Sequence, residues 1–300
     1  MRVHTVADPS PKLIMKTTPV QYDVVAAKLR FANMDTRSLR STEAMLMAVC
    51  CGLFAMALWG PSEDLPAHYH AFADRRAWQS LPNALDVLSN LGFAIFGVLG
   101  LLRLWAAGRA VVWSAQRQMV VLFFLGLALT ALCSGIYHWQ PDDAGLKLDR
   151  VGMAMAFAGL LGLLAADRVS DRAGQALALL VLLAGPVAAS IALTSQNQLP
   201  WVVVQFGGLA IMVWLSFLKP MPGALPVRWL AVILIYALAK LLELGDLAVY
   251  EWTGQLVSGH SLKHLVASFA AWPVLTALPR LPMPCLPDDS KVHRAPAGAR

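Results

Sequence analysis

The chain alternates between long apolar runs and short polar segments. The runs cover residues 44–59, 83–105, 118–138, 148–166, 175–193, 200–218, 227–249 and 260–278. All but the first have about the length that a helix needs to cross a hydrocarbon core roughly 30 Å thick. A lone strand would leave its backbone groups unpaired in lipid, whereas a helix pairs them internally. The pattern therefore predicts an all-α, polytopic transmembrane helix bundle, with a seven-helix core over 83–279 and one extra N-terminal transmembrane helix at 44–59.

The polar segments predict the orientation of this bundle. With the N-terminus inside and eight alternating helices, 18 of the 24 Lys and Arg residues fall on inside segments and four fall outside. Inside loops of membrane proteins carry such an excess of positive charge. We therefore expect a cytoplasmic tail at 1–43, an outer loop at 60–82 and a second cytoplasmic tail at 280–300, with both termini cytoplasmic.

Composition narrows the class of protein further. The chain is 58% hydrophobic and 14% charged, against about 25% charged residues in a typical soluble domain. This excludes a cytosolic enzyme and a disordered chain. The net charge of +6 is spread over separate loops, so it indicates a membrane orientation signal and no nucleic-acid partner. The four cysteines contain no CxxC pair, which argues against a disulfide framework or a cysteine zinc site.

Several ionisable residues lie at matched depth near the predicted outer ends of three helices. His138 ends one run, and Ser134 lies four residues earlier on the same helix face. Asp149 opens the next run, and His260 and His264, again four apart, open the last. Three neutral imidazoles with one open position are a common catalytic zinc arrangement, and a His pair four residues apart supplies two ligands from one helix. The sequence predicts a zinc site near the outer side of the membrane, with His138, His260 and His264 as ligands.

The same pattern resembles a known family. A Ser-x3-His at the end of one helix, an Asp eleven residues later and a His-x3-His at the start of the last helix resemble the alkaline ceramidases. These enzymes belong to the CREST superfamily of membrane hydrolases, which also includes the progestin and adipoQ receptors. Residues 83–90, which end in a Ser-Asn pair, resemble the family's first core helix. The resemblance covers about residues 83–278.

The resemblance implies a function and a role for each residue. His138, His260 and His264 match the zinc ligands, Asp149 matches the aspartate near the metal-bound water, and Ser134 matches the active-site serine. The implied activity is zinc-dependent hydrolysis of the amide bond of ceramide-like lipid substrates, giving a sphingoid base and a fatty acid. Two alternatives stay open: a seven-helix receptor or sensor with a structural zinc site, and a proton-coupled transporter. The oligomeric state is also open.

The eukaryotic ceramidases also have an acidic calcium-binding stretch before the first core helix. Here the comparable segment holds Glu63, Asp64 and Asp74, but their spacing differs and Arg75 and Arg76 intrude. We therefore do not expect calcium and interpret the segment as a solvated loop.

Four further charged residues lie in or near the last two runs. Lys240 and Glu243 are three residues apart and should form an ion pair. Asp246 or Glu243 could orient a zinc-bound His. Lys263 is expected to face away from the site and extend its ammonium to lipid head groups. His70, in the outer loop, is expected to be solvated.

Overall fold

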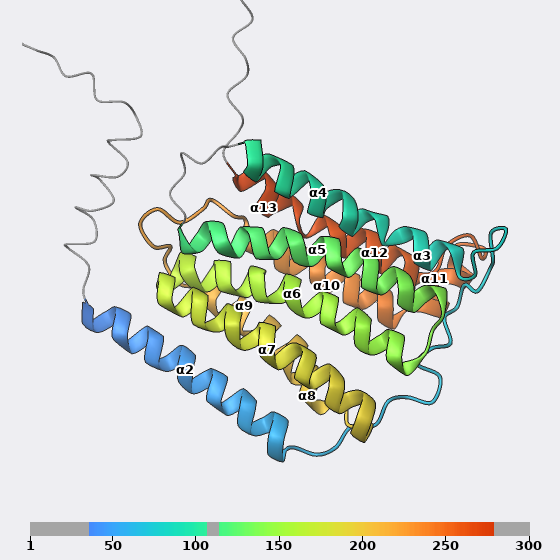
Figure 1. The fold of residues 1–300 in the computed structure, drawn as a ribbon, viewed down its shortest axis with the longest axis horizontal. Helices are drawn as coiled ribbons and strands as arrows, with labels where there is room; N and C mark the ends of the chain where they lie inside the picture. Colours follow the sequence, from blue (N-terminus) through green and yellow to red (C-terminus); the bar gives the residue numbers. More distant parts are fainter. Residues whose placement is uncertain (1–35, 107–113, 279–300) are drawn as a thin grey trace, which may run out of the picture.

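The computed structural model describes residues 36–106 and 114–278, and every named element within them is a helix. Figure 1 shows these helices running side by side as a bundle. In chain order they are α2 (Thr36–Trp59), α3 (Ala84–Ser89), α4 (Leu91–Ala106), α5 (Ala115–Trp139), α6 (Asp143–Arg168), α7 (Asp171–Ser195), α8 (Leu199–Val202), the π-helix η1 (Val203–Gly207), α9 (Gly208–Ser216), α10 (Trp229–Leu244), α11 (Asp246–Trp252), α12 (Gly259–Phe269) and α13 (Trp272–Ala277).

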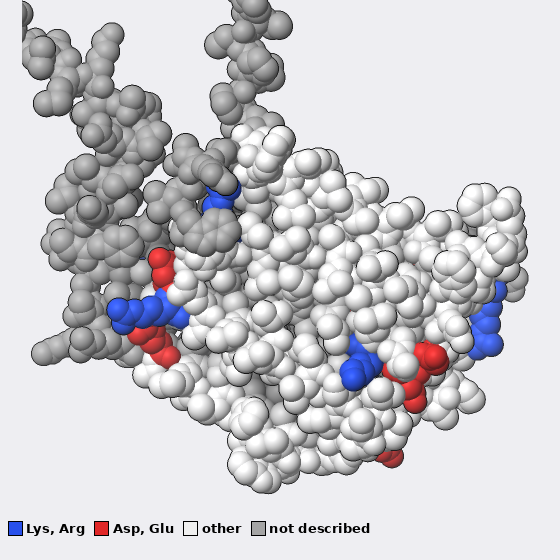
Figure 2. All heavy atoms as spheres, viewed as in Figure 1, with Lys and Arg blue, Asp and Glu red and all other residues white. Residues whose placement is uncertain are grey.

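Six of the described helical segments are long and apolar enough to cross a membrane. They are Ser41–Trp59, Ala84–Ala106, Ala115–Trp139, Asp143–Arg168, Asp171–Ser195 and Leu199–Ser216. On the face shown in Figure 2, charged side chains gather toward the two ends of the helices and leave the surface between them uncharged. A helical membrane protein is therefore the class that the structure supports, as the apolar runs predicted.

The last two predicted spans are not continuous helices. The run 227–249 is divided into α10 and α11 at Gly245, and the run 260–278 is divided into α12 and α13. Pro273 lies in the first turn of α13, where its missing N–H and fixed φ are tolerated. The lengths of the helices therefore do not establish that the core crosses the membrane seven times.

The extra N-terminal helix is longer than predicted. It begins at Thr36, eight residues before the predicted run 44–59; the first 35 residues of the predicted N-terminal tail and the C-terminal tail 280–300 lie outside the described residues. Helix α2 lies at the edge of the bundle in Figure 1 and packs chiefly against α8 and η1. Only 6% of its most apolar 18-residue window is buried, against 72% for α6.

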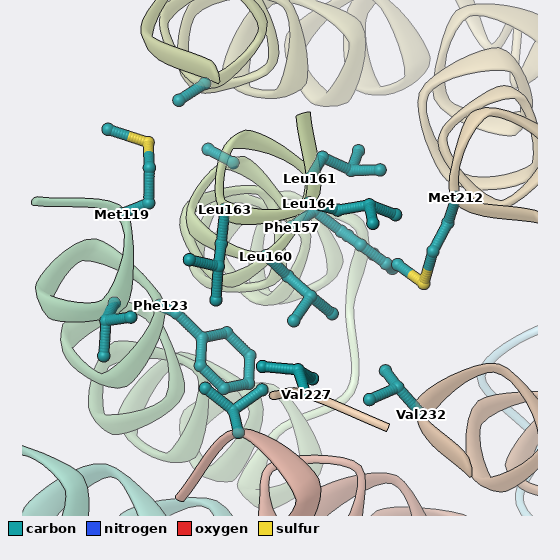
Figure 3. Packing of buried hydrophobic residues seen from close by; sticks show 14 of the residues in the cluster. Met119, Phe123, Phe157, Leu160, Leu161, Leu163, Leu164, Met212, Val227 and Val232 are labelled. Atoms are coloured by element: carbon teal, nitrogen blue, oxygen red, sulfur yellow. The ribbon is translucent and has the colours of Figure 1, made fainter. Parts of the chain in front are cut away.

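The hydrophobic core lies around α6, which packs between α5 and α7. Figure 3 shows leucines of α6 among side chains of α5 and α9, which include Phe123 and Met212. Close approach of the helices depends on small residues, because a Cβ on Gly159 would lie 2.2 Å from the backbone N of Phe123. This tight packing holds α5 and α6 side by side, and both helices carry residues of the candidate site.

Candidate metal centre

Three buried imidazoles from two helices meet at one end of the bundle. His138 lies in the last turn of α5, whereas His260 and His264 lie in α12. One ligand nitrogen from each ring can be chosen so that all three lie within 4.8 Å of one another. The Nε2 atoms of His138 and His260 are 3.3 Å apart. The structure thus brings together the three predicted histidines in a group that could hold a metal ion.

The backbone around α12 explains why its two histidines point to this spot. The Ser258 hydroxyl caps the helix by accepting a hydrogen bond from the backbone N of Ser261 at 3.0 Å. The residue after Ser258 must be a glycine, because a Cβ on Gly259 would lie 2.2 Å from the carbonyl oxygen of Leu242 in α10. The first turn of α12 is therefore pressed against α10, with His260 and His264 four residues apart on its inner face.

The neighbours of His264 suit one tautomer of its ring. The Ser89 hydroxyl lies 2.9 Å from the carbonyl oxygen of Asp86, to which it can donate its one hydrogen. Its oxygen also lies 2.8 Å from Nδ1 of His264 and can then accept Nδ1–H. In that tautomer Nε2 of His264 carries a lone pair that can bind a cation. Such an orienting partner is typical of metal-bound histidines.

His138 and His260 are held mainly through their backbones. The carbonyl oxygen of His138 accepts a hydrogen bond from Asn83 Nδ2 at 2.9 Å. The backbone N of His260 donates to Asp246 Oδ1 at 2.8 Å. Nδ1 of His138 is buried and has no hydrogen-bond partner among the described residues. Asp246 thus supports a histidine, as one reading of the sequence allowed, but through the main chain of His260 and not through its ring.

An aromatic side chain from the segment before α3 covers the imidazoles. Phe72 is buried, and its ring centroid lies 4.7 Å from that of His138 and 4.5 Å from that of His260. The next residue, Ala73, donates its backbone N–H to Asp246 Oδ2 at 3.0 Å. Asp246 therefore ties this segment, residues 60–83, to the helix that carries two of the histidines. We call residues 60–83 the cap loop.

The cap loop is more ordered than the sequence predicted. His70 is not simply solvated, because its Nδ1 lies 2.9 Å from the Tyr137 hydroxyl and its Nε2 lies 3.0 Å from Asp143 Oδ1. Asp74 is 2% exposed, and Arg76 donates to both of its carboxylate oxygens. The hydrogen bonds from the Arg76 guanidinium hold the pKa of Asp74 below its usual value.

The three acidic residues considered for calcium are not gathered in the structure. The backbone N–H of Glu63 bonds to the Asn197 side chain, and Asp64 forms an isolated bridge with Asn197. Asp74 is engaged by Arg76. Among the described residues, the only group of three or more His, Cys, Asp or Glu side chains placed to bind a metal is the histidine trio.

The two predicted catalytic residues lie together at the same end of the bundle. Ser134 is buried in α5, one turn before His138, and Asp149 lies near the start of α6, which packs against α5. Asp149 Oδ1 is shielded from solvent and has no hydrogen-bond partner among the described residues. Within those residues no hydrogen bond joins Asp149 to an imidazole. The carboxyl group therefore has a free acceptor oxygen.

The structure corrects the prediction for Lys263. Its ammonium does not extend to the surface but lies 2.6 Å from Glu243 Oε1, and the side chain is 17% exposed. Glu243 also pairs with Lys240, as the spacing in sequence predicted. Sequence reasoning missed the Lys263–Glu243 pair because it joins two helices, 20 residues apart. Phe72 was also missed, because a single aromatic residue in a loop carries no signal of what it covers.

The chain matches no known family, no curated protein and no solved structure. The positions of the three histidines are therefore what identifies this group as a candidate metal centre.

Proposed function

We propose that the protein is a membrane-embedded, zinc-dependent amidohydrolase that cleaves the amide bond of ceramide-like lipids. The observation that carries the proposal is the convergence of three buried imidazoles with two Nε2 atoms 3.3 Å apart. Nitrogens bound to one tetrahedral zinc ion at about 2.0–2.1 Å would stand about 3.3 Å from one another. Three neutral nitrogen ligands also suit zinc better than a hard cation such as calcium.

The hydrogen-bond pattern supports a cation in this position. A ring nitrogen of His138 faces one of His260 at hydrogen-bonding distance, yet the pair is buried and lies beside a third ring. Without a cation, one of the two rings donates its Nε2–H to the other, and the third ring takes no part in that bond. With a cation, the three lone pairs share one partner and Ser89 continues to hold Nδ1–H of His264.

The residues around the trio match the requirements of amide hydrolysis. A zinc ion supplies Lewis-acid polarisation of a carbonyl and an activated water at neutral pH. The free oxygen of Asp149 can accept a proton from the attacking water and return it to the amine as the C–N bond breaks. The Ser134 hydroxyl can donate a hydrogen bond to the carbonyl oxygen as negative charge develops there. Ser134 is not a covalent nucleophile in this scheme, because no free imidazole is available as its base.

The choice of substrate rests on two supports. The first is the sequence resemblance to the alkaline ceramidases, which is carried by the serine, the aspartate and the three histidines. The second is location, since the site is buried at one end of a membrane bundle and a surface hollow borders the cap. Phe72 and Asp246 line this hollow, together with Ala71, Ala73, Arg75, Leu244 and Leu247. An amphipathic lipid could present its amide to the site by this route.

A receptor or sensor with a structural zinc site is the second candidate. The burial of all three imidazoles and the Phe72 ring stacked over two of them favour it, because structural zinc sites are closed whereas catalytic ones keep an open position. A proton-coupled transporter, the third hypothesis from the sequence, gains no specific support from the site.

One experiment separates an enzyme from a structural site. The purified full-length protein is incubated with ceramide, and release of fatty acid is compared between the parent, Asp149→Asn and the control Asp171→Asn, which changes an exposed carboxylate at the start of α7. Loss of a general acid–base group lowers turnover by about 10²–10⁴-fold. We expect that loss only in Asp149→Asn, with metal content unchanged. Stoichiometric zinc without any lipid hydrolysis in the parent would favour the receptor.

A further inference from the structure

Helix α3 and the residue before it contact both helices that carry the histidines, although α3 is only six residues long. Asn83, at the start, donates a hydrogen bond from Nδ2 to the carbonyl oxygen of His138 in α5 at 2.9 Å. Ser89, at the end, has its hydroxyl 2.8 Å from Nδ1 of His264 in α12. The short helix therefore lies against the candidate metal centre at both of its ends.

Asp86, in the first turn of α3, adds a third contact and is 0% exposed. Its Oδ1 accepts a hydrogen bond from the Ser261 hydroxyl at 2.5 Å and lies 3.4 Å from the Ser258 hydroxyl. Ser258 caps α12, and Ser261 is the residue after His260. The carboxylate of Asp86 thus binds the first turn of α12 from the side of α3.

The main chain of Asp86 is connected to the same site. Its carbonyl oxygen lies 2.9 Å from the Ser89 hydroxyl and accepts a hydrogen bond from Asn90 Nδ2 at 2.8 Å. Ser89 in turn contacts Nδ1 of His264. Asp86 therefore reaches the surroundings of the histidines by two routes, through its carboxylate and through its carbonyl oxygen.

The bond to Ser261 bears on how α12 is rotated about its own axis. Successive residues of an α-helix lie about 100° apart around the axis, so Ser261 is about 100° from His260 and about 60° from His264. A side-chain bond at that angle holds the helix at one rotation. Asp246 also holds this turn, by accepting the backbone N–H of His260. That N–H points roughly along the helix axis, so its bond fixes the end of α12 more than the rotation.

We infer that Asp86 is a positioning residue of the metal centre, because its bond to Ser261 sets the rotation of α12 at which both histidines of that helix face His138. The inference rests on the metal centre of the proposed function and adds to it a residue that is not itself a ligand. The position requires a hydrogen-bond acceptor, so an amide oxygen should serve there as well. A role in folding stability alone would leave the arrangement of the ligands around the metal unchanged.

The test compares two buried aspartates at opposite ends of the bundle. Asp167, near the end of α6, is also 0% exposed, and in both residues Oδ1 accepts hydrogen bonds while Oδ2 has no partner among the described residues. Asp86→Ala, Asp86→Asn and Asp167→Ala are made in the full-length protein. Zinc affinity is measured by competition with a calibrated chelator. The visible absorption of the protein loaded with Co²⁺ instead of zinc reports the ligand geometry around the ion.

We expect Asp86→Ala to weaken zinc affinity by about 10–100-fold, the usual effect of losing a group that orients a ligand, and to change the cobalt spectrum. Asp86→Asn should stay close to the parent in both measurements, because its amide oxygen can accept from Ser261. Asp167→Ala should lower the melting temperature but leave zinc affinity and the cobalt spectrum as in the parent.

Unchanged zinc affinity and cobalt spectrum in Asp86→Ala would overturn the inference, as would an Asp86→Asn variant as weak as Asp86→Ala. A parent without stoichiometric metal would overturn it too. If Asp86→Ala does not fold, Ser261→Ala decides, since it keeps the Ser258 cap: zinc affinity equal to that of the parent contradicts the inference. Failure of the proposed function is seen separately, when the variants follow the expected order but the zinc-loaded parent releases no fatty acid from ceramide.

Discussion

Both ends of the helix bundle bury polar side chains, but the two ends use them differently. At the end opposite the histidines, Asp167 lies in the last turn of α6, and its Oδ1 accepts from Gln116 at 2.9 Å and from the backbone N of Leu225 at 3.4 Å. Its own carbonyl oxygen accepts from the backbone N of Met221 at 2.7 Å. Oδ2 has no partner among the described residues. The other two oxygens accept hydrogen bonds from the protein, and these bonds hold the segment that joins α9 to α10.

At the histidine end, ring nitrogens face one another. Nε2 of His138 and Nε2 of His260 lie 3.3 Å apart beside His264, and Nδ1 of His138 has no partner among the described residues. The comparison teaches that burial of a polar group does not by itself indicate function, because Asp167 is as buried as His138. The informative difference is what the buried polar atoms face. The Asp167 oxygens accept from amide N–H groups of the chain, whereas ring nitrogens of His138, His260 and His264 converge on one point and form a group that could hold a cation.

The largest expected difference between the two ends is in metal content. His264→Ala removes one of three ligands and should abolish stoichiometric metal binding. Asp167→Asn changes a carboxyl group at the end opposite the histidines. Its burial is similar to that of His264, and the change should leave metal content unchanged. It should lower the free energy of unfolding by about 1–3 kcal/mol, because buried hydrogen bonds are weakened. Metal analysis and thermal unfolding of both purified variants check this, and equal metal loss in the two would refute the comparison.

A smaller effect is expected from two serines that make the same backbone contact. Ser89 donates to the carbonyl oxygen three residues earlier and also contacts Nδ1 of His264, whereas Ser216 makes only the first kind of bond, to Val213, among the residues that the structure describes. Ser89→Ala should weaken metal affinity by about 10–100-fold, the usual effect of losing a group that orients a ligand. Ser216→Ala serves as the matched control. Competition with a calibrated chelator measures both, and similar affinities in the two variants would show that Ser89 does not orient the imidazole.

The smallest expected effect concerns the cap loop and its dependence on pH. The pKa of Asp74 is lowered in the folded protein by Arg76, so the pair stabilises the fold above the unfolded pKa of about 3.9. This contribution is lost as pH falls through the lower, folded pKa. Asp74→Asn should therefore lower the melting temperature at pH 7, and its difference from the parent should shrink below about pH 4. A difference independent of pH would mean that the carboxylate charge is not what stabilises the loop.

The sequence predicted the long helices well where apolar runs are uninterrupted. The run 118–138 corresponds to α5 (Ala115–Trp139), because length and hydropathy report directly on a spanning helix. The same signal could not show that the runs 227–249 and 260–278 are each divided into two helices. The length of an apolar run shows that a helix could span the membrane, but it does not show where that helix is interrupted. Pro273 was not recognised as lying at the start of a new helix.

The part of the site that was predicted is the part that depends on spacing within a single helix. His260 and His264 share a face by their spacing alone, and His138 was matched to them by depth. Contacts between distant segments could not be predicted: Lys263 with Glu243, Ser89 with His264, and Asp246 with Ala73. These depend on how far one helix is rotated and shifted against another, which packing decides and no local pattern records.

The central claim is that His138, His260 and His264 bind one metal ion together. X-ray absorption at the metal edge, combined with metal analysis of the purified protein, tests it most directly. The account predicts one zinc ion per chain with three imidazole nitrogens at about 2.0–2.1 Å. Substoichiometric metal, or a coordination shell without imidazole nitrogens, would contradict it.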